Sequence, residues 1–347
     1  MASPISIGIV ADLRTYQSYF SRFCVRHPDC HLIEIHILER DLDEDFPTKM
    51  AEVEAFIRDQ KINHLSFHAP DLLMQSVLFE EESPHLEDDK RKFSLFFDTI
   101  RRLSDNLCMD VIVVVHQGIK LPNASFAHMT PAQFDAWREQ KLKKAQESYR
   151  ALRASLSGSK VIAALENSPP FAGDSDRQHI MDLAFEDFAA RMDDGVANAN
   201  AKSDRPSFVF DCSHAALCVE YFKHHDGSRS EDARKSEPHA QDKMNSFGLE
   251  SVRRKYHGIP PSLRSVEDYV RCAGKHVCWM HISDANGFLP DNEGKVIGVA
   301  GSVIDFKKLF RAICAHVQDP KGVLELVNAH KDYGLLETSM TNIQKYL

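Results

Sequence analysis

The chain has 347 residues, of which 43% are hydrophobic and 27% are charged, and its formal net charge is -9. These proportions are ordinary for a soluble globular enzyme. No run approaches the roughly 20 apolar residues of a membrane-spanning helix. The negative charge gives no general attraction to nucleic acid, although a local basic patch is compatible with it. Residues 1–10 have no basic region, so we expect no secretory signal and a cytoplasmic location.

The eight cysteines are scattered along the chain, and none forms a CxxC pair. In a chain of this length we expect reduced, mostly buried thiols and no disulfide framework.

Eight apolar, β-rich runs recur along the chain, and most of them end in polar residues. In chain order they are Ser6–Asp12, His31–Leu38, His64–Pro70, Asp110–Gly118, Val161–Ser168, Ser207–His214, Val277–Asp284 and Val323–Ala329. Segments with helical spacing of apolar residues lie between or after them: Ala51–Gln60, Lys90–Leu107, Gln133–Leu156, Ile180–Met192, Val266–Ala273, Phe306–His316 and Leu335–Leu347. This alternation predicts a parallel sheet whose faces are covered by helices.

Eight such units predict a single (β/α)8 TIM barrel over residues 1–347. An open doubly wound sheet is the alternative, but it usually carries a glycine-rich first turn, and residues 11–14 are Ala-Asp-Leu-Arg. Two stretches look inserted: Pro70–Asp89 after the third run, and a long charged segment at about residues 223–262 after the sixth. We expect the second to be a solvated loop over the barrel mouth or partly disordered.

Metal-ligand residue types fill the ends of the predicted strands, which in a barrel converge on one cup. They are His68, His116, Glu166, Asp211 with His214, His281 with Asp284, and Glu325. Buried carboxylates are unfavourable unless they are paired or coordinated. We therefore predict a divalent-metal site of mixed imidazole and carboxylate ligands, which suits Zn, Mn, Fe or Co, with Mg as a further alternative. For Asp12, Glu34 and His36 we expect structural pairing.

Six short motifs in order carry a resemblance to a known family. They are His68-Ala69-Pro70, His116-Gln117-Gly118, Leu165-Glu166-Asn167, residues 211–215 (Asp-Cys-Ser-His-Ala), residues 280–284 (Met-His-Ile-Ser-Asp) and Leu324-Glu325. With them, almost the whole chain resembles the xylose-isomerase-like TIM-barrel superfamily. This superfamily includes sugar isomerases, ketose 3-epimerases and endonuclease IV.

The isomerase and epimerase branch implies one metal, held by Glu166, Asp211, His281 and Glu325. The metal would chelate two neighbouring oxygens of a sugar-like substrate, while Glu166 and Glu325 move a proton and His214 hydrogen-bonds a substrate oxygen. Further substrate contacts are expected from His68, His116, Asp284 and Lys120, with Lys120 or Arg14 as the partner of a phosphate or carboxylate.

The endonuclease IV branch implies further metals. His68, His116 and Glu166 would form a second site, with Glu166 bridging to the first, and a metal-bound hydroxide would attack a phosphodiester. A third metal in that branch uses the equivalent of His214 with an Asp-x-His pair. Here the corresponding residues are Asp291-Asn292-Glu293, so a glutamate replaces the histidine.

Two features weaken the nucleic-acid interpretation. Asp71 stands where endonuclease IV has an aromatic residue that touches DNA, and an acid there would repel a phosphate backbone. The sequence also has no Arg/Lys run interleaved with aromatic residues.

We therefore predict a divalent-metal-dependent sugar or sugar-phosphate isomerase or epimerase that acts on a small polyhydroxylated or phosphorylated substrate. One alternative is an endonuclease IV-like di- or trinuclear phosphodiesterase (an AP endonuclease), and another is a non-catalytic ligand-binding barrel. The sequence leaves open the substrate, the native metal, and the oligomeric state, with a homo-oligomer among the alternatives.

Overall fold

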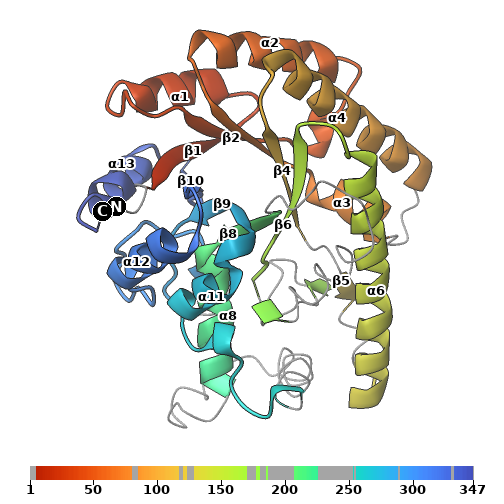
Figure 1. The fold of residues 1–347 in the computed structure, drawn as a ribbon, viewed down its shortest axis with the longest axis vertical. Helices are drawn as coiled ribbons and strands as arrows, with labels where there is room; N and C mark the ends of the chain where they lie inside the picture. Colours follow the sequence, from red (N-terminus) through yellow and green to blue (C-terminus); the bar gives the residue numbers. More distant parts are fainter. Residues whose placement is uncertain are drawn as a thin grey trace.

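Eight parallel strands close into a barrel in the computed structural model, in the order β1-β10-β9-β8-β6-β4-β3-β2 (Figure 1). The structure describes residues 5–79, 85–116, 120–122, 129–169, 177–179, 185–186, 207–225, 253, 255–287, 290–329 and 332–346. The barrel strands are β1 (Ser6–Asp12), β2 (Leu32–His36), β3 (His64–His68), β4 (Val111–His116), β6 (Val161–Glu166), β8 (Phe208–Asp211), β9 (Val277–Ile282) and β10 (Lys321–Leu324). The predicted (β/α)8 barrel is thus confirmed.

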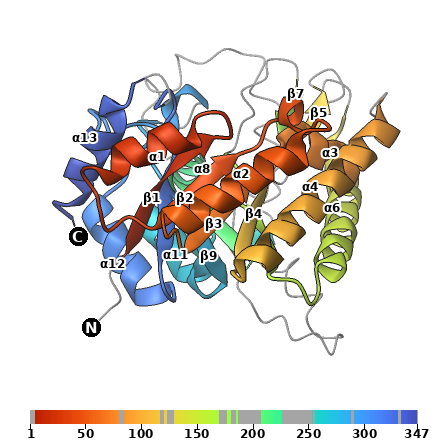
Figure 2. The same ribbon diagram turned by 90° about the horizontal axis from the view of Figure 1, so that it is seen from above.

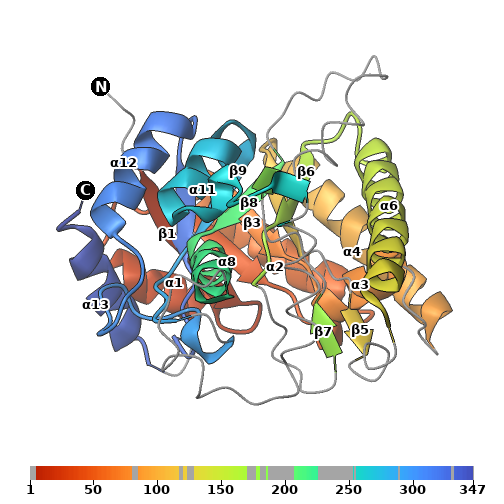
Figure 3. The same ribbon diagram turned by 90° about the horizontal axis from the view of Figure 1, so that it is seen from below.

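Helices surround the strands. They are α1 (Tyr16–Cys24), α2 (Phe46–Asp59), α3 (Asp71–Phe79), α4 (Leu86–Leu107), α6 (Pro131–Ser155), α8 (Cys212–His225), α11 (Val266–Ala273), α12 (Phe306–His316) and α13 (Gly334–Ile343). Helices α1 and α2 lie in front when the molecule is seen from above (Figure 2), and α8, α11 and α12 lie in front from below (Figure 3). The first five residues of β4, Val-Ile-Val-Val-Val, are all buried, as expected for a strand covered on both faces.

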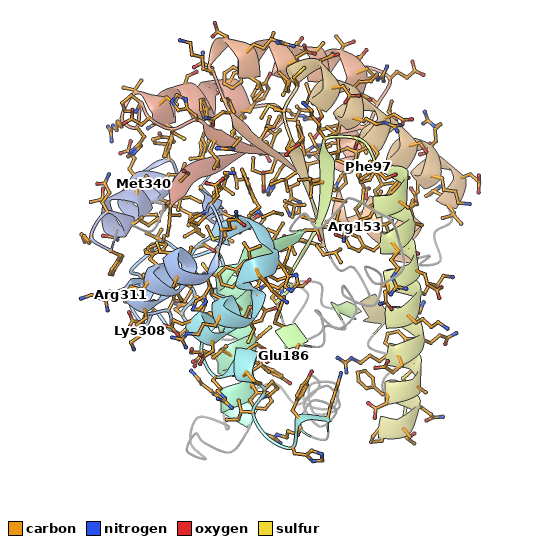
Figure 4. All side chains as sticks on the ribbon, viewed as in Figure 1. Phe97, Arg153, Glu186, Lys308, Arg311 and Met340 are labelled. Atoms are coloured by element: carbon orange, nitrogen blue, oxygen red, sulfur yellow. The ribbon has the colours of Figure 1, made fainter. Side chains whose placement is uncertain are left out.

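The barrel interior and the helix-facing layer form separate apolar clusters. Inside the barrel, one cluster joins Leu32, Ile112, Val114, Ala164, Val209, Trp279 and Val323 from different strands. A larger cluster lies between strands and helices. In Figure 4, side chains fill the middle of the molecule, whereas Lys308 and Arg311 of α12 lie at its outer edge. The interior cluster is the apolar floor on which the polar strand ends rest.

Several predicted strands are shorter than expected. The run Ser207–His214 ends as a strand at Asp211, because Cys212 already begins α8. The eighth run was expected over Val323–Ala329, whereas β10 spans Lys321–Leu324 and the residues after it turn. Helices α1, α3 and α8 were not predicted. Their apolar residues follow closely on the strands, which masks the change from strand to helix periodicity.

The two predicted insertions have different outcomes. The stretch 70–89 includes helices of the barrel and is not only an insertion, because Asp71–Phe79 form α3 and α4 begins at Leu86. In the segment 223–262, residues 226–252 and 254 lie outside the described residues, and the rest includes the end of α8 and a 3-10 turn that begins at Pro261. A further element, which the sequence did not predict, is a small antiparallel sheet of β5 (Lys120–Pro122) and β7 (Arg177–His179).

All eight cysteines are free thiols, as predicted, but only Cys30, Cys212 and Cys218 are buried, so the expectation of mostly buried thiols was wrong. Among the residues that the structure describes, no helix is both long and apolar enough to cross a membrane.

We expect the substitution Gly8→Ala to destabilise the barrel. A Cβ at Gly8 would lie 2.1 Å from the backbone oxygen of Leu32 on the neighbouring strand, and a strand backbone yields little. Overpacking of this kind costs about 1–3 kcal/mol, so the urea midpoint should fall. The matched control is Gly258→Ala, whose Cβ would meet no atom within 4 Å. Equal midpoints for the two variants would contradict the close approach.

Candidate metal centre

Strand alternation brings the polar residues of the site to one level of the barrel. On several strands the ligand-type residue comes two positions after an interior apolar residue, as in Val114 and His116, Ala164 and Glu166, or Trp279 and His281. Because side chains alternate between the two faces of a strand, both members of each pair point inward.

The register between strands then sets these residues side by side. His36 pairs with His68 across β2 and β3. His116 pairs with Glu166 across β4 and β6. Asp211 pairs with His281 across β8 and β9. The result is a nearly continuous ring of imidazoles and carboxylates above the apolar floor.

A central group consists of Glu166, Asp211, His281 and Glu325, whose ligand atoms all lie within 4.8 Å of one another. His281 Nδ1 is 2.8 Å from Glu325 Oε2, 2.9 Å from Glu166 Oε1 and 3.9 Å from Asp211 Oδ2. Ligands about 2.0–2.2 Å from one ion lie roughly 3–4.4 Å apart. The four side chains therefore fit around a single divalent ion after small adjustments.

A second group of His68, His116 and Glu166 adjoins the first. His116 Nε2 lies 2.7 Å from Glu166 Oε2 and 3.1 Å from His68 Nε2. Glu166 therefore directs Oε1 to the central group and Oε2 to this one. That is the arrangement of a carboxylate that can bridge two ions.

A third group, His36, His68 and Glu325, lies on the other side of His68. His68 Nδ1 is 3.2 Å from the carbonyl oxygen of Ala69, which can only accept, so Nδ1 carries the proton and Nε2 is the ligand atom. His68 therefore contributes to one flanking group at a time.

Two carboxylates lie behind the histidines and orient them. Glu34 is fully buried, accepts a hydrogen bond from Ser66 Oγ at 2.6 Å, and lies 3.0 Å from His281 Nε2. Asp71 Oδ1 lies 3.0 Å from His116 Nδ1. A carboxylate on the far nitrogen fixes the tautomer of an imidazole and leaves its other nitrogen for a metal. Glu34 thus pairs structurally, as expected, but its partner is a candidate ligand. The expectation that Asp71 acts as a repulsive acid needs revision, because its charge is engaged by His116.

The charges of the group are strongly coupled. Burial would raise the pKa of Glu166, but the charges of His281 and His116 and their hydrogen bonds hold it well below its usual range. Burial would likewise lower the pKa of His281, but Glu166, Glu325 and Glu34 raise it well above its usual range. Acids and imidazoles thus stabilise one another's charged forms in a site with little solvent.

Asp211 is positioned by its own loop. Its N–H donates to Asn167 Oδ1 at 2.8 Å, and its Oδ1 accepts from Ser213 Oγ at 2.9 Å and from the N–H of His214 at 2.7 Å. Oδ2 is thereby left to face His281. Burial raises the pKa of Asp211 to about 7, partly offset by the charge of His214.

The carboxylates and imidazoles of these groups are chemically suited to bind a divalent ion. Oε2 of Glu166 and Oε1 of Glu34 are buried and meet no hydrogen-bond donor of suitable geometry among the described residues. Unsatisfied buried carboxylate oxygens are costly. Mixed oxygen and imidazole nitrogen ligation is typical of Zn, Mn or Fe sites.

The other predicted site residues, His214, Asp284, Asp291 and Glu293, lie outside the three groups. His214 Nε2 is 3.6 Å from Glu293 Oε2, so these two residues meet, whereas Asp291 is exposed on a 3-10 turn. Asp284 has no exposed surface; Oδ1 accepts from the N–H of Ala285, and Oδ2 accepts from the N–H of Gly298, both bonds within the loop after β9.

Lys120 and Arg14 are the two cations expected near an anionic substrate group. Lys120 is the first residue of β5, and its side chain lies outside the described residues. Arg14 Nε lies 3.3 Å from Asp41 Oδ1 and lines a separate cavity of about 470 Å³. Their predicted roles stay predictions.

A cavity of about 650 Å³ opens onto the site. Its wall includes Asp12, Thr15, His36, His214, Glu293 and Glu325. The side chain of Glu325 is 26% exposed, whereas Glu166 and His281 have no exposed surface. The central group is therefore reached from the Glu325 side.

Comparisons with known proteins rest on structure alone, since no family model and no curated protein matches the chain. The 3-keto-D-glucoside 4-epimerase of E. coli matches with a TM-score of 0.58 and 12% identity, over 99% of this chain and 100% of that chain. The D-psicose 3-epimerase of Clostridium cellulolyticum H10 matches with a TM-score of 0.54 and 12% identity, over 99% and 98%. A xylose isomerase domain protein of Alicyclobacillus acidocaldarius matches with a TM-score of 0.51 and 12% identity, over 97% and 98%. The chain therefore shares the TIM-barrel fold of these structures. Six of the predicted ligand residues lie at or directly beside the carboxyl ends of barrel strands, namely His68, His116, Glu166, Asp211, His281 and Glu325. Of the other three, His214 lies in α8, and Asp291 and Glu293 lie in the loop after β9.

We expect Glu34→Gln to weaken metal binding without removing a ligand of the central group. An amide is a poorer partner than a carboxylate for His281 Nε2, and loss of such a partner typically lowers metal affinity about 10- to 100-fold. Competition with a chromogenic chelator measures the dissociation constant. Glu44→Gln, which makes the same change at an exposed position, serves as control. An unchanged affinity would mean that Glu34 only fills space.

Proposed function

We propose that the protein is a divalent-metal-dependent isomerase or epimerase of a small polyhydroxylated substrate. The observation that carries this proposal is the central group of Glu166, Asp211, His281 and Glu325 at the inner end of a cavity of about 650 Å³. That volume suits a small molecule such as a sugar.

The same four residues would hold the ion. A bound divalent ion would polarise two neighbouring oxygens of the substrate and lower the pKa of the carbon acid or hydroxyl between them. Glu325 is the member of the group whose partly exposed side chain reaches the cavity, so it can meet a substrate proton. Hydroxyl side chains of the wall, Thr15 and Ser18, can hydrogen-bond a polyhydroxylated substrate.

The fold matches are consistent with this class of reaction. The matched structures include epimerases of 3-keto-D-glucoside and of D-psicose. Ketohexoses such as D-psicose and D-tagatose are therefore the first compounds to test.

A second candidate function is metal-dependent hydrolysis of a phosphoester. It is favoured by the second group, in which His68, His116 and Glu166 converge and Asp71 orients His116. Two ions that share Glu166 would suit the attack of water on a phosphodiester.

Metal stoichiometry separates the two candidates. We expect elemental analysis of the purified protein to give one divalent ion per chain, and His116→Ala to retain it, because His116 is not part of the central group. Two ions per chain, one of them lost in His116→Ala, together with hydrolysis of bis(4-nitrophenyl) phosphate, would replace the isomerase assignment with the hydrolase.

Both glutamates of the central group should be required for turnover. We expect Glu325→Gln and Glu166→Gln to lower kcat for a ketohexose by about 10²–10⁴-fold, the range for loss of a proton-transfer or metal-binding group. Polarimetry or chromatography of the sugar product measures the rate, with Glu44→Gln as control. Wild-type activity in either variant would refute the proposed metal site.

A further inference from the structure

The cavity beside the central metal group has one strongly basic side chain in its wall. Of the described residues that line it, Arg22 is the only lysine or arginine, whereas four are acids: Asp12, Asp211, Glu293 and Glu325. These acids lie at strand ends or in the loop after β9, and Arg22 lies in α1. The acidic and basic parts of the wall therefore belong to different elements of the barrel.

Helix α1 carries Arg22 along one side of the cavity. Thr15, the N-cap of α1, lines the cavity together with Ser18 and Arg22 of the helix. These residues stand at positions i, i+3 and i+7, which lie on one face of a helix. At a rise of about 1.5 Å per residue, the stretch from Thr15 to Arg22 spans about 10 Å. This face of α1 thus leads from the strand end at Asp12 to an arginine about two turns further along.

Two tyrosines hold the Arg22 side chain in place. Helices α1 and α13 lie next to each other (Figure 2), and Arg22 Cζ lies 3.9 Å from the ring centroid of Tyr333, the residue before α13. The Tyr333 ring packs edge-on against Tyr19, with centroids 5.4 Å apart, and the Tyr19 hydroxyl donates to the carbonyl oxygen of Ala329. A guanidinium stacked on an aromatic ring keeps its N–H groups at the edge for hydrogen bonds.

No acid neutralises the charge of Arg22 within the described part of the chain. Arg26, which follows one turn later, forms an ion pair with Glu337 of α13. Arg14 pairs with Asp41 and lines a different cavity. Among these three arginines, only Arg22 both lines the cavity and forms no ion pair with a described residue. Such a guanidinium can hold a phosphate or carboxylate through two parallel hydrogen bonds.

We propose that Arg22 binds an anionic group, a phosphate or a carboxylate, which the sugar substrate carries at the end remote from its reacting carbons. This proposal rests on the proposed isomerase or epimerase function and names the class of substrate. The reacting carbons lie at the central metal group, and the hydroxyl groups of the sugar pass Thr15 and Ser18. An anionic group held by Arg22 fixes which end of the sugar meets Glu325. Arg22 is therefore a binding residue that determines specificity.

Isothermal titration calorimetry of the manganese-loaded protein tests this with three pairs of sugars: D-fructose 6-phosphate and D-fructose, trehalose 6-phosphate and trehalose, and D-glucuronate and D-glucose. We expect at least one anionic sugar to bind about 10- to 100-fold more tightly than its neutral counterpart, the range for hydrogen bonds to a charged group. The pair that shows the difference identifies the group as phosphate or carboxylate.

Arg22→Gln should reduce that difference to about threefold or less, because the amide has no charge. Arg22→Lys, which keeps the charge but not the planar fork, should retain part of it. The matched control is Arg26→Gln, which alters the neighbouring contact between α1 and α13 and should retain all of it. Equal binding within every pair would overturn the proposal. A difference that persists in Arg22→Gln would also overturn it, because the anion would then be bound by another group.

Turnover separates the anion subsite from the function on which it rests. For an anionic sugar that the protein isomerises, we expect Arg22→Gln to raise KM about 10-fold or more and to leave kcat within about twofold. Turnover of neutral ketohexoses without any preference for anionic sugars would overturn the subsite and leave the isomerase assignment standing. An Arg22-dependent preference in a protein that isomerises no sugar would retain the subsite and remove the isomerase assignment.

Discussion

Buried carboxylates at the carboxyl end of the barrel impose the main physical constraint on this molecule. Glu34 and Glu166 have no exposed surface, and an unpaired buried carboxylate costs several kcal/mol. Each is compensated by imidazole nitrogens at about hydrogen-bond distance, such as those of His281 and His116. The histidines are therefore needed for the stability of the cup as well as for any metal chemistry, and the two requirements select the same residues.

The barrel satisfies this constraint through alternation and register. Inward-facing positions below the cup are apolar, and the next inward position on the same strand is an acid or a histidine. Neighbouring strands then place His116 opposite Glu166 and Asp211 opposite His281. The shift from apolar to polar occurs at one level on many strands, which produces a polar site directly above a packed core.

The loops complete what the strands begin. Asp284 lies two residues after β9, yet its carboxylate bonds to the loop that continues to Ser302 and does not reach the cavity wall. Through this loop Glu293 is brought opposite His214, which itself is oriented by Asn167. The strands thus supply the proposed metal ligands, and the anchored loop brings Glu293 to the cavity wall.

The sequence by itself determined the fold class and most members of the site, because β–α alternation repeated eight times has one closed solution and strand ends in that solution converge. His68, His116, Glu166, Asp211, His281 and Glu325 were all predicted in this way, and the structure gathers them into adjoining groups. Only the tertiary structure decided how these residues are paired. Glu34 meets His281 across 247 positions of sequence, and Asp71, expected to repel a phosphate backbone, engages His116. The sequence also did not show that Glu293 would line the cavity while Asp291 is exposed. Hydrogen bonds that Asp284 and Val327 make to this loop set the two positions. Such contacts depend on register and loop path, which local sequence patterns do not encode.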